Sequence, residues 1–503
     1  MIWLWLLIAG VVAFLVHQLW YKRLKYPAGP MPWPIFGHGL EIYRCERWED
    51  RLLEWKKQYG SIYTYWLGPI PVITVNDYKT AVEMFVKDGE SYSDRYIMMQ
   101  IIYKMRGGVF GILDTNGDEW RVQRRFALKV LRDFGLGKNV MQDRILEEVQ
   151  TICENVNKEL DEIGDGEIDM QKHTNLAIGS IINNVICGYR FSTNGREQEY
   201  YRIKELFNRL VNPKLNPLLL IAGIAEVCKI NIPPLKRYHE RSLEEFREIF
   251  NFVNKSADEH LANTDYSQLV EPRDFIDAYI MAGIQSEQED GKNEHYTRNH
   301  LRNTGADIWA AGMETTANTV HWAIAYLIVY SDEQRKLQEE LDNIVGSDRL
   351  ITLADRQNLP FSCAVVTEVQ RCANILSQNL LRMTSRDVVI NGKHIPKGTV
   401  CVPQMSTIMM DGTVFKDPKR FNPSRFIDSN GQFKPNDEVI PFSIGKRACM
   451  GEALARMELF LIIINLFNQY KFFAGNSPPI LQRYPNGGSP NLKPYVCRIQ
   501  RRF

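Results

Sequence analysis

The chain has 503 residues, of which 45% are hydrophobic and 24% charged, and its formal net charge is +1. This composition is that of a folded globular protein and excludes collagen-like and low-complexity chains. The small net charge gives no global signal for binding nucleic acid or an acidic partner, so any electrostatic docking must be local.

An apolar segment of 20 residues, Ile2–Tyr21, begins the chain and carries no formally charged side chain. As a helix it would be ~30 Å long, about the thickness of the hydrocarbon core of a bilayer. Lys22, Arg23 and Lys25 follow it, whereas a cleaved signal peptide, the alternative, carries positive charge before its apolar run. We therefore predict residues 1–21 to be a retained membrane anchor, with the rest of the chain on the cytosolic side.

Residues 22–40 are predicted to be a basic, proline-rich linker. Four prolines restrict φ and remove backbone donors, so neither a helix nor a central strand is expected around them. Such a segment acts as a semi-rigid spacer, and an ordinary proline-rich surface turn is the alternative. The prolines are Pro27, Pro30, Pro32 and Pro34.

Residues 41–503 contain no internal repeat and no convincing linker, so they predict one mainly α-helical domain with a small β component. The apolar segment 218–225 is too short to cross a bilayer, and a buried helix is favoured over a second membrane contact. Hydrophobic periodicity predicts helices over 139–160, 166–190, 197–211, 235–262, 298–346, 361–376 and 452–469, and strands near 60–76 and 387–402.

Trp120 and Arg124 are spaced one helical turn apart, so an indole N–H and a guanidinium can reach the same anionic group. By itself this pattern is weak. A run of basic residues surrounds the pair, and a solvated helix face is the default interpretation of the run. The run consists of Arg121, Arg125, Lys129, Arg132 and Lys138.

Residues 305–330 predict a long, mostly apolar helix interrupted by Glu314, Thr315 and Thr316. An acid inside such a helix is costly to bury unless it has a partner or a task. A threonine hydroxyl can bond back to a carbonyl one turn earlier, and Gly312 lets the helix bulge or kink. The pattern predicts a small polar notch suited to dioxygen and an ordered water; a surface pair on an amphipathic helix is the alternative.

Glu368 and Arg371 are spaced i, i+3, so they share a helix face and can form an ion pair. At Glu199 and Arg202, which have the same spacing, a solvated surface pair is expected. The residues around Glu368 are apolar, and because an uncompensated buried ion would be costly, a further partner is expected there.

Cys449 lies in the stretch Phe442–Gly451, just before an apolar helical pattern. The positive end of a helix dipole and nearby N–H groups favour a thiolate at such a position. The nine cysteines form no Cys-x-x-Cys pair and their number is odd, which argues against a disulfide scaffold or a zinc site and favours a reducing compartment. We predict that Cys449 is a thiolate ligand to a haem iron, with a small buried hydrophobe as the alternative.

The stretch Phe442–Gly451 resembles, at every fixed position, the F-x-x-G-x-R-x-C-x-G haem loop of the cytochrome P-450 family. The segment Ala311–Thr316 matches the distal helix motif of that family, and Trp120 with Arg124 matches its W-x-x-x-R motif. The resemblance extends from the anchor to the C-terminus and is closest to animal microsomal members that oxidise xenobiotics, steroids and fatty acids.

The resemblance implies a single, mainly helical triangular prism with a minor sheet-rich lobe, and haem b held by an axial thiolate. Thr315 would stabilise the reduced oxygen at the iron and Glu314 would supply protons. Arg425, from the segment Pro423–Phe426, would join Glu368 and Arg371 in a structural network. Phe442 would shield the sulfur, while the arginines and Trp120 would bind the propionates. The residues implied to bind haem are Trp120, Arg124, Arg382, Phe442, Arg447 and Cys449.

The sequence contains no G-x-G-x-x-G and no second redox domain, so a separate electron donor is expected. The resemblance implies NADPH-cytochrome P-450 reductase, docked on the basic run, with cytochrome b5 as a further candidate. The other expected partners are O2, membrane lipid and a lipophilic small-molecule substrate, with no nucleic acid. The implied location is the cytosolic face of the endoplasmic reticulum membrane.

Two other functions fit the cysteine loop. An O2-independent haem-thiolate isomerase or dehydratase usually lacks the acid and threonine that stand here at 314 and 315, and a non-catalytic haem sensor needs no polar notch. By the resemblance, the substrate pocket should draw on residues 98–113, 205–228, 307–315, 376–382 and 484–490. The apolar side chains expected to line it include Ile101, Phe110, Ile112, Leu219, Trp309, Ala311 and Leu380.

Overall fold

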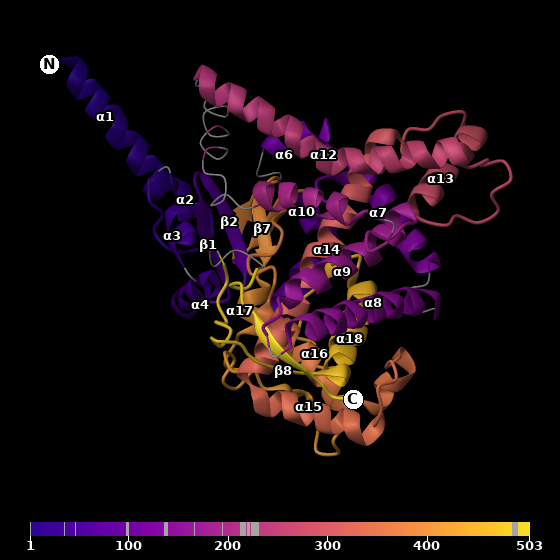
Figure 1. Ribbon diagram of the computed structural model, residues 1–503. Helices are drawn as coiled ribbons and strands as arrows, with labels where there is room; N and C mark the ends of the chain where they lie inside the picture. Colours follow the sequence, from indigo (N-terminus) through magenta and orange to yellow (C-terminus); the bar gives the residue numbers. More distant parts are fainter. Residues whose placement is uncertain are drawn as a thin grey trace. The chain divides into compact units, whose positions relative to one another are not determined.

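The computed structural model describes most of the chain, which forms two compact units (Figure 1). Unit 1 comprises Met1–Tyr96, Thr367–Cys449 and Ile480–Pro494; unit 2 comprises Ile97–Val366, Met450–Pro479 and Tyr495–Phe503. The described residues are 2–34, 36–45, 47–96, 100–134, 139–164, 166–193, 195–211, 218, 222, 231–484 and 491–503.

Unit 1 is built on a five-stranded sheet with the strand order β1-β2-β7-β4-β3. Its first two strands are rich in β-branched and aromatic residues, which favour a pleated, buried surface, and they form an antiparallel hairpin in which Ile62 pairs with Val75. The strands of this unit are β1 Ile62–Leu67, β2 Ile70–Val75, β3 Asp94–Arg95, β4 Arg382–Met383, β5 Val388–Ile390, β6 Lys393–Ile395 and β7 Val400–Pro403. Its helices are α1 Ile2–Val16, α2 Lys22–Leu24, α3 Gly39–Arg44, α4 Trp48–Tyr59, α5 Tyr78–Val82, α17 Met405–Met409 and the end of α16 Pro360–Ala373.

The predicted anchor is helical, but its α-helix α1 ends at Val16 and a π-helical turn, His17–Tyr21, follows. Within the described residues, no helix combines the length and the apolar character needed to cross a membrane. The four prolines of the predicted linker lie outside named helices and strands, as expected.

Unit 2 is helical, with α14 packed against α9, α12 and α18 (Figure 1). Its small sheet joins β8 Tyr470–Ala474 and β9 Cys497–Arg501 in antiparallel fashion. Its helices are α6 Gln100–Arg106, α7 Gly117–Asp133, α8 Asn139–Ile163, α9 Met170–Cys187, α10 Glu197–Val211, α12 Pro233–Asn263, α13 Phe275–Asp290, α14 Arg298–Val329, α15 Ser331–Ile344 and α18 Glu452–Gln469.

The predicted class, mainly α with a small β component, is confirmed, and α10 and α18 have the predicted bounds. The single helix predicted over 298–346 is wrong, because the backbone leaves the helical region at Tyr330 and two helices result. The segment 218–225 lies outside the described residues except for Leu218 and Ala222. One domain over 41–503 and the prism shape stay predictions.

Candidate haem site

Cys449 differs from the other cysteines in its exposure. Of the eight cysteines in the described part of the chain, it alone is exposed to solvent. Burial raises the pKa of the Cys153 thiol to about 11 and that of the Cys401 thiol to about 12, which keeps both protonated. The thiol that the sequence singles out is therefore the accessible one.

The loop before Cys449 is held in one conformation by its backbone. Gly445 has φ +74°, and a Cβ there would collide with the carbonyl oxygen of Phe85, so only glycine fits. The Cys449 amide donates to the Phe442 carbonyl over 2.9 Å, which closes the loop on itself. The structure thus gives a conformational reason for Gly445 and presents the thiol from a fixed turn.

Two buried guanidiniums flank this loop within unit 1. Arg447, 5% exposed, donates from Nε to the Ser93 carbonyl over 2.6 Å. Arg382, 1% exposed, donates from Nη2 to the Ser443 hydroxyl (2.9 Å) and to the Ile444 carbonyl (2.7 Å). Two positive charges at this loop complement a ligand with two carboxylates.

The network expected around Glu368 is confirmed in unit 1. Arg371 donates to both oxygens of the wholly buried Glu368 carboxylate (2.7 and 2.8 Å), and Arg425 donates from Nε to Oε1 over 3.0 Å. The Asn422 amide donates to the same oxygen over 2.9 Å. One buried carboxylate is therefore shared by two guanidiniums, and the buried charge of Glu368 has the partners that a buried ion requires.

In unit 2, the middle of α14 carries an accessible stripe of small side chains. Ala311 is exposed and Thr315 is half-buried, although most of the helix is buried, and these two residues form the stripe. Gly312, between them in sequence, packs against α9, because a Cβ there would collide with Ile182. The Thr315 hydroxyl donates to the Ala311 carbonyl over 2.7 Å, which confirms the bond back to the preceding turn. The stripe thus places one hydroxyl at an accessible position of α14.

Glu314 is buried, so the alternative of a surface pair is wrong. One of its carboxylate oxygens accepts a hydrogen bond from Asn318 Nδ2 over 2.9 Å, and the other has no partner among the described residues. Lys204 on α10 is close enough for the two charges to attract; burial lowers the pKa of Lys204 and Glu314 opposes that shift. Glu314 is thus a buried carboxylate with one oxygen available to a donor.

Glu458 on α18 is a buried acid that the sequence interpretation missed. Its carboxylate accepts a hydrogen bond from the Thr316 hydroxyl over 3.3 Å, and its other oxygen has no partner in the described part of the chain. Burial raises the pKa of Glu458 to about 8. An acid inside the apolar pattern RMELFL was the available signal, since such a residue is costly to bury in its charged form.

Replacing Glu458 with glutamine is expected to remove a pH dependence of stability. The folded wild type holds the proton up to about pH 8, whereas the unfolded chain releases it above about pH 4.5, so wild-type stability falls as pH rises between these values. The free energy of unfolding of Glu458→Gln, measured relative to that of the wild type, should therefore rise by about 1.4 kcal/mol for each pH unit from about pH 5 to 8. Denaturant unfolding at several pH values measures this difference.

Glu452→Gln, on the same helix but with 42% of its side chain exposed, is the matched control and should show little such trend. A difference between Glu458→Gln and wild type that stays constant with pH would mean that Glu458 is ionised in the folded protein.

On helix α7, the residues predicted to bind haem and the residues of the basic run differ in their exposure. Trp120 is buried, and the guanidinium of the half-buried Arg124 lies 5.8 Å from the centre of its ring. The expectation of a solvated basic face is confirmed for the described members of the run, while Lys138 lies outside the described residues. The exposed basic residues are Arg121, Arg125, Lys129 and Arg132.

Asp307 on α14 fixes a segment predicted to line the substrate pocket. Its Oδ2 accepts hydrogen bonds from the amides of Ile112 (2.8 Å) and Leu113 (3.1 Å), and its Oδ1 pairs with Arg106 at 2.5 Å. The sequence interpretation placed position 307 in a pocket-lining stretch but missed its anchoring role, although an acid in an apolar helix was again the signal. Asp307 thus ties Arg106, Ile112 and Leu113, which belong to one of the stretches predicted to line the pocket, to α14.

Not every residue predicted for the substrate pocket is in a position to line one. Trp309 is wholly buried, with its ring 5.4 Å from that of Phe252, so it faces no open cavity in this structure, and its place in the pocket stays a prediction. Ala311 and Leu380 are exposed. Leu219 and the side chain of Ile101 lie outside the described residues.

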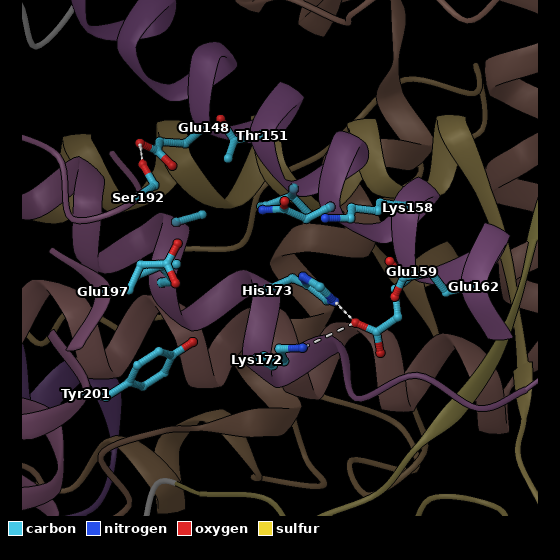
Figure 2. A pocket seen from close by; sticks show the side chains of 14 residues that line it. Glu148, Thr151, Lys158, Glu159, Glu162, Lys172, His173, Ser192, Glu197 and Tyr201 are labelled. Carbon is cyan, nitrogen blue, oxygen red and sulfur yellow. Dashed lines mark hydrogen bonds and ion pairs between the residues drawn. The ribbon is translucent and has the colours of Figure 1, made fainter. Parts of the chain in front are cut away.

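A cavity of about 240 Å³, away from the stretches predicted to line the substrate pocket, lies among α8, α9 and α10 in unit 2 (Figure 2). Its lining is polar: His173 contacts Glu159 at 2.9 Å, and Lys172 also points to that carboxylate. None of its residues belongs to the predicted lining stretches, and its charged walls do not suit a lipophilic ligand.

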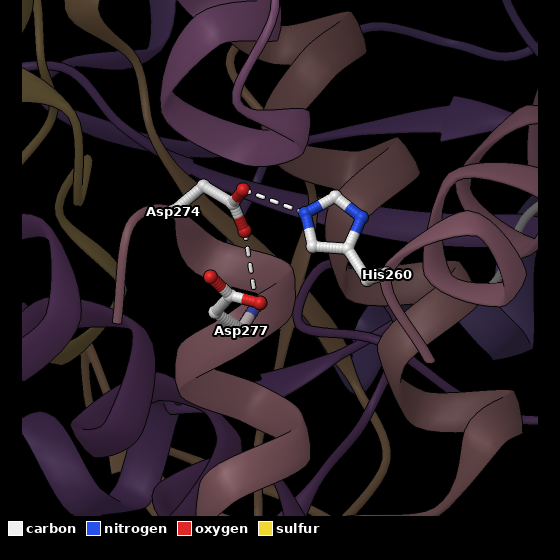
Figure 3. Close-up of side chains that lie close together, drawn as sticks. All are labelled: His260, Asp274 and Asp277. Carbon is white, nitrogen blue, oxygen red and sulfur yellow. Dashed lines mark hydrogen bonds and ion pairs between the residues drawn. The ribbon is translucent and has the colours of Figure 1, made fainter. Parts of the chain in front are cut away.

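One group in the described part of the chain brings metal-ligating atoms close together: His260, Asp274 and Asp277 (Figure 3). Arg273 donates to both oxygens of the Asp277 carboxylate (2.6 and 3.1 Å), and His260 Nε2 lies 2.7 Å from Asp274 Oδ2. Both acids are therefore engaged by partners within the protein, and the group is a hydrogen-bonded and ion-paired cluster at the start of α13.

The donor set at Cys449 fits a haem. A porphyrin supplies four nitrogen ligands itself, so one thiolate suffices where other metals need several side chains, and Cys449 is not part of the one metal-type cluster described above. Arg382, Phe442, Arg447 and Cys449 belong to unit 1, whereas Trp120, Arg124, Glu314 and Thr315 belong to unit 2.

Comparison with known proteins gives the family. Residues 27–498 match the family model described as Cytochrome P450. Cytochrome P450 2C39 of Mus musculus is 32% identical over 505 residues, which cover 98% of this chain and 99% of that protein. Cytochrome P450 2D26 of Rattus norvegicus is 34% identical over 477 residues, which cover 92% and 91%. The resemblance inferred from the motifs is confirmed.

Proposed function

The chain belongs to the cytochrome P450 family and is a haem-thiolate monooxygenase, and we propose that Cys449 is its haem ligand and that it works at the endoplasmic reticulum membrane. It inserts one atom of O2 into a lipophilic xenobiotic, steroid or fatty acid. Electrons come from NADPH-cytochrome P-450 reductase, with cytochrome b5 as a further donor.

The exposure of Cys449 carries this proposal. A thiol must be accessible to bind iron, and the other described cysteines are buried or half-buried. Within unit 1, Arg382 and Arg447 would hold the haem propionates and Phe442 would shield the sulfur; in unit 2, the family motif implies the same propionate role for Trp120 and Arg124. When bound, the haem supplies electron transfer and cleavage of the O–O bond, which an axial thiolate promotes.

Glu314 and Thr315 hold and move protons in this proposal. The Thr315 hydroxyl, on the accessible stripe of α14, now donates to the Ala311 carbonyl, and by turning away from it could donate a proton or hydrogen bond on the side of the substrate and O2. The unpartnered oxygen of Glu314 takes up protons and passes them to the stripe through water. This intact pair argues against an O2-independent isomerase.

Thr315→Ala is expected to uncouple NADPH consumption from oxygenation. A proton donor that acts in a reaction typically accelerates that step by about 10²–10⁴-fold, so its loss slows the productive route. The hydrogen peroxide released per NADPH consumed should rise several-fold in the reconstituted system. Thr319→Ala is the matched control, since its hydroxyl makes the same bond to the Thr315 carbonyl (2.8 Å) but is buried. Equal peroxide yields from both variants would remove Thr315 from this role.

The exposed basic face of α7 is proposed to dock the reductase. Arg125→Glu should raise the reductase concentration needed for half-maximal NADPH turnover several-fold, and the effect should shrink as salt increases. Lys255→Glu, an equal charge change at an exposed position on α12, is the control. An equal effect of both variants would indicate a response to net charge and contradict docking on α7.

The apolar segment 2–21 is proposed to anchor the protein, with the cytosolic orientation set by the basic residues after it. Resistance of the protein to alkaline carbonate extraction from microsomes tests the anchor. The catalytic claim is tested by reconstitution with the reductase and NADPH on a panel of lipids and xenobiotics. Products that gain one oxygen atom support it; NADPH use with no oxygenated product across the panel counts against it.

A further inference from the structure

The polar cavity among α8, α9 and α10 has no part in the proposed monooxygenase chemistry (Figure 2). It lies wholly within unit 2, and its walls carry more acidic than basic side chains. Burial lowers the pKa of His173 in its wall, so that ring is uncharged near neutral pH. The other charged side chains of the lining are Glu148, Glu159, Glu162, Glu197, Lys158 and Lys172.

Glu148 on α8 is the buried acid of this cavity. Only 1% of it is exposed, and its Oε1 accepts hydrogen bonds from Arg190 Nε and from the Ser192 hydroxyl (2.9 Å). Its other oxygen, Oε2, has no partner among the described residues, and Figure 2 shows it turned away from Ser192 toward the cavity. A buried acceptor without a partner is costly, and folded proteins rarely leave one, so this oxygen requires a donor from outside the chain.

The charges around Oε2 indicate that this donor is a cation. The four carboxylates of the cavity face three cations, Lys158, Lys172 and Arg190, which leaves an excess of one negative charge. Arg190 is already bonded to the other oxygen of Glu148, and Lys172 lies 3.4 Å from Glu159. A ligand with a single ammonium group balances the excess, and its N–H groups suit a carboxylate oxygen through charge-assisted hydrogen bonds.

Part of the lining is apolar. Ile152 on α8 and Leu176 and Ala177 on α9 contribute to it, and each is at most 8% exposed. Methylene groups gain free energy against such a surface, whereas a hydrated metal ion does not. Apolar walls with a few placed polar groups are typical of sites for small organic ligands.

We propose that this cavity binds a small aliphatic primary amine, with its ammonium at Glu148 Oε2 and its alkyl chain against Ile152, Leu176 and Ala177. The site is separate from the residues proposed to bind haem and from the stretches predicted to line the substrate pocket. Because α8, α9 and α10 all line the cavity, the bound amine stabilises the packing of these three helices.

Equilibrium dialysis of radiolabelled n-butylamine against the full-length holoenzyme in detergent tests this proposal. Carbon monoxide on the reduced haem keeps the amine from the iron. At low ionic strength we expect saturable binding of one amine per chain. A matched concentration of n-butanol, which has the same chain without the charge, should not displace it.

Glu148→Gln should weaken this binding about tenfold or more, because a hydrogen bond to a charged group is lost. Glu154→Gln is the matched control, an equal charge change at an exposed position of α8 outside the cavity, and should change the affinity less than about twofold. Thermal unfolding of each variant checks that it is folded.

Glu197→Lys keeps the test decisive if Glu148→Gln does not fold, since Glu197 is exposed at the start of α10 and its replacement leaves the buried packing untouched. It should weaken amine binding several-fold, and Glu154→Lys should not.

Three results would overturn the proposal. The first is the absence of saturable amine binding, and the second is equal weakening by the cavity variants and their controls, which would assign binding to net charge. The third is displacement of the amine by n-butanol or by Mg²⁺ at the same concentration, which would mean that the charge is not recognised or that the site takes an inorganic cation.

Discussion

Glu368→Ala is expected to lower the free energy of unfolding by about 3–5 kcal/mol, the usual cost of removing one partner from a buried ion pair. The wild-type carboxylate is wholly buried and bonded by both Arg371 and Arg425. Its removal leaves the buried Arg371 guanidinium with carbonyl acceptors at Met409 and Pro418 and with no carboxylate within this network. Denaturant unfolding of the full chain in detergent measures the change.

Glu248→Ala is the matched control for this prediction. Arg202 donates two hydrogen bonds to Glu248 (2.6 and 2.9 Å), nearly as Arg371 does to Glu368, but 70% of the Arg202 side chain is exposed. Solvent screens such a pair, so little change is expected. Similar losses from both substitutions would show that burial of Glu368 is not the source of its effect.

Cys449→Ser is expected to abolish monooxygenase turnover in a folded protein. A serine hydroxyl does not ionise near neutral pH and gives no anionic ligand. The loss should exceed the roughly 10–100-fold that substitutions beside a metal ligand typically cost. NADPH-dependent oxygenation in the reconstituted system, together with the unfolding transition, separates lost chemistry from lost structure.

Cys45→Ser provides the comparison, since Cys45 is half-buried in the same unit. Turnover should stay near the wild-type level. A Cys449→Ser variant that retains turnover and thiolate spectra would assign the ligand to another residue.

Sequence patterns predicted elements whose ends carry clear signals. The helix 197–211 has apolar residues at helical spacing among charged ones, and 452–469 is an apolar run that begins after Gly451. The predicted bounds of both helices agree with the structure. The boundary between α14 and α15 was missed because Tyr330 ends one helix with no glycine or proline, and the next begins at Ser331. The signal that was available is Ser331 followed by Asp332 and Glu333, since such residues favour the start of a helix.

The residues of the site also fall into those that the sequence singles out and those that it does not. Cys449, Gly445 and Arg447 stand within one short motif, so sequence alone singles them out. Glu458 and Asp307 act on partners far along the chain, Thr316 at a separation of 142 residues and Leu113 at 194. An acid in an apolar helix signals that a partner exists, but not which one, because the fold decides what packs against it.

Reduction of the purified wild-type protein under carbon monoxide is the most direct test of the central claim, that Cys449 ligates a haem as its thiolate. We predict a difference spectrum with the red-shifted Soret band typical of thiolate-ligated haem, and its absence in Cys449→Ser. A Soret band at the ordinary position of a haem ligated by nitrogen, or an unchanged red-shifted band in Cys449→Ser, would contradict the claim.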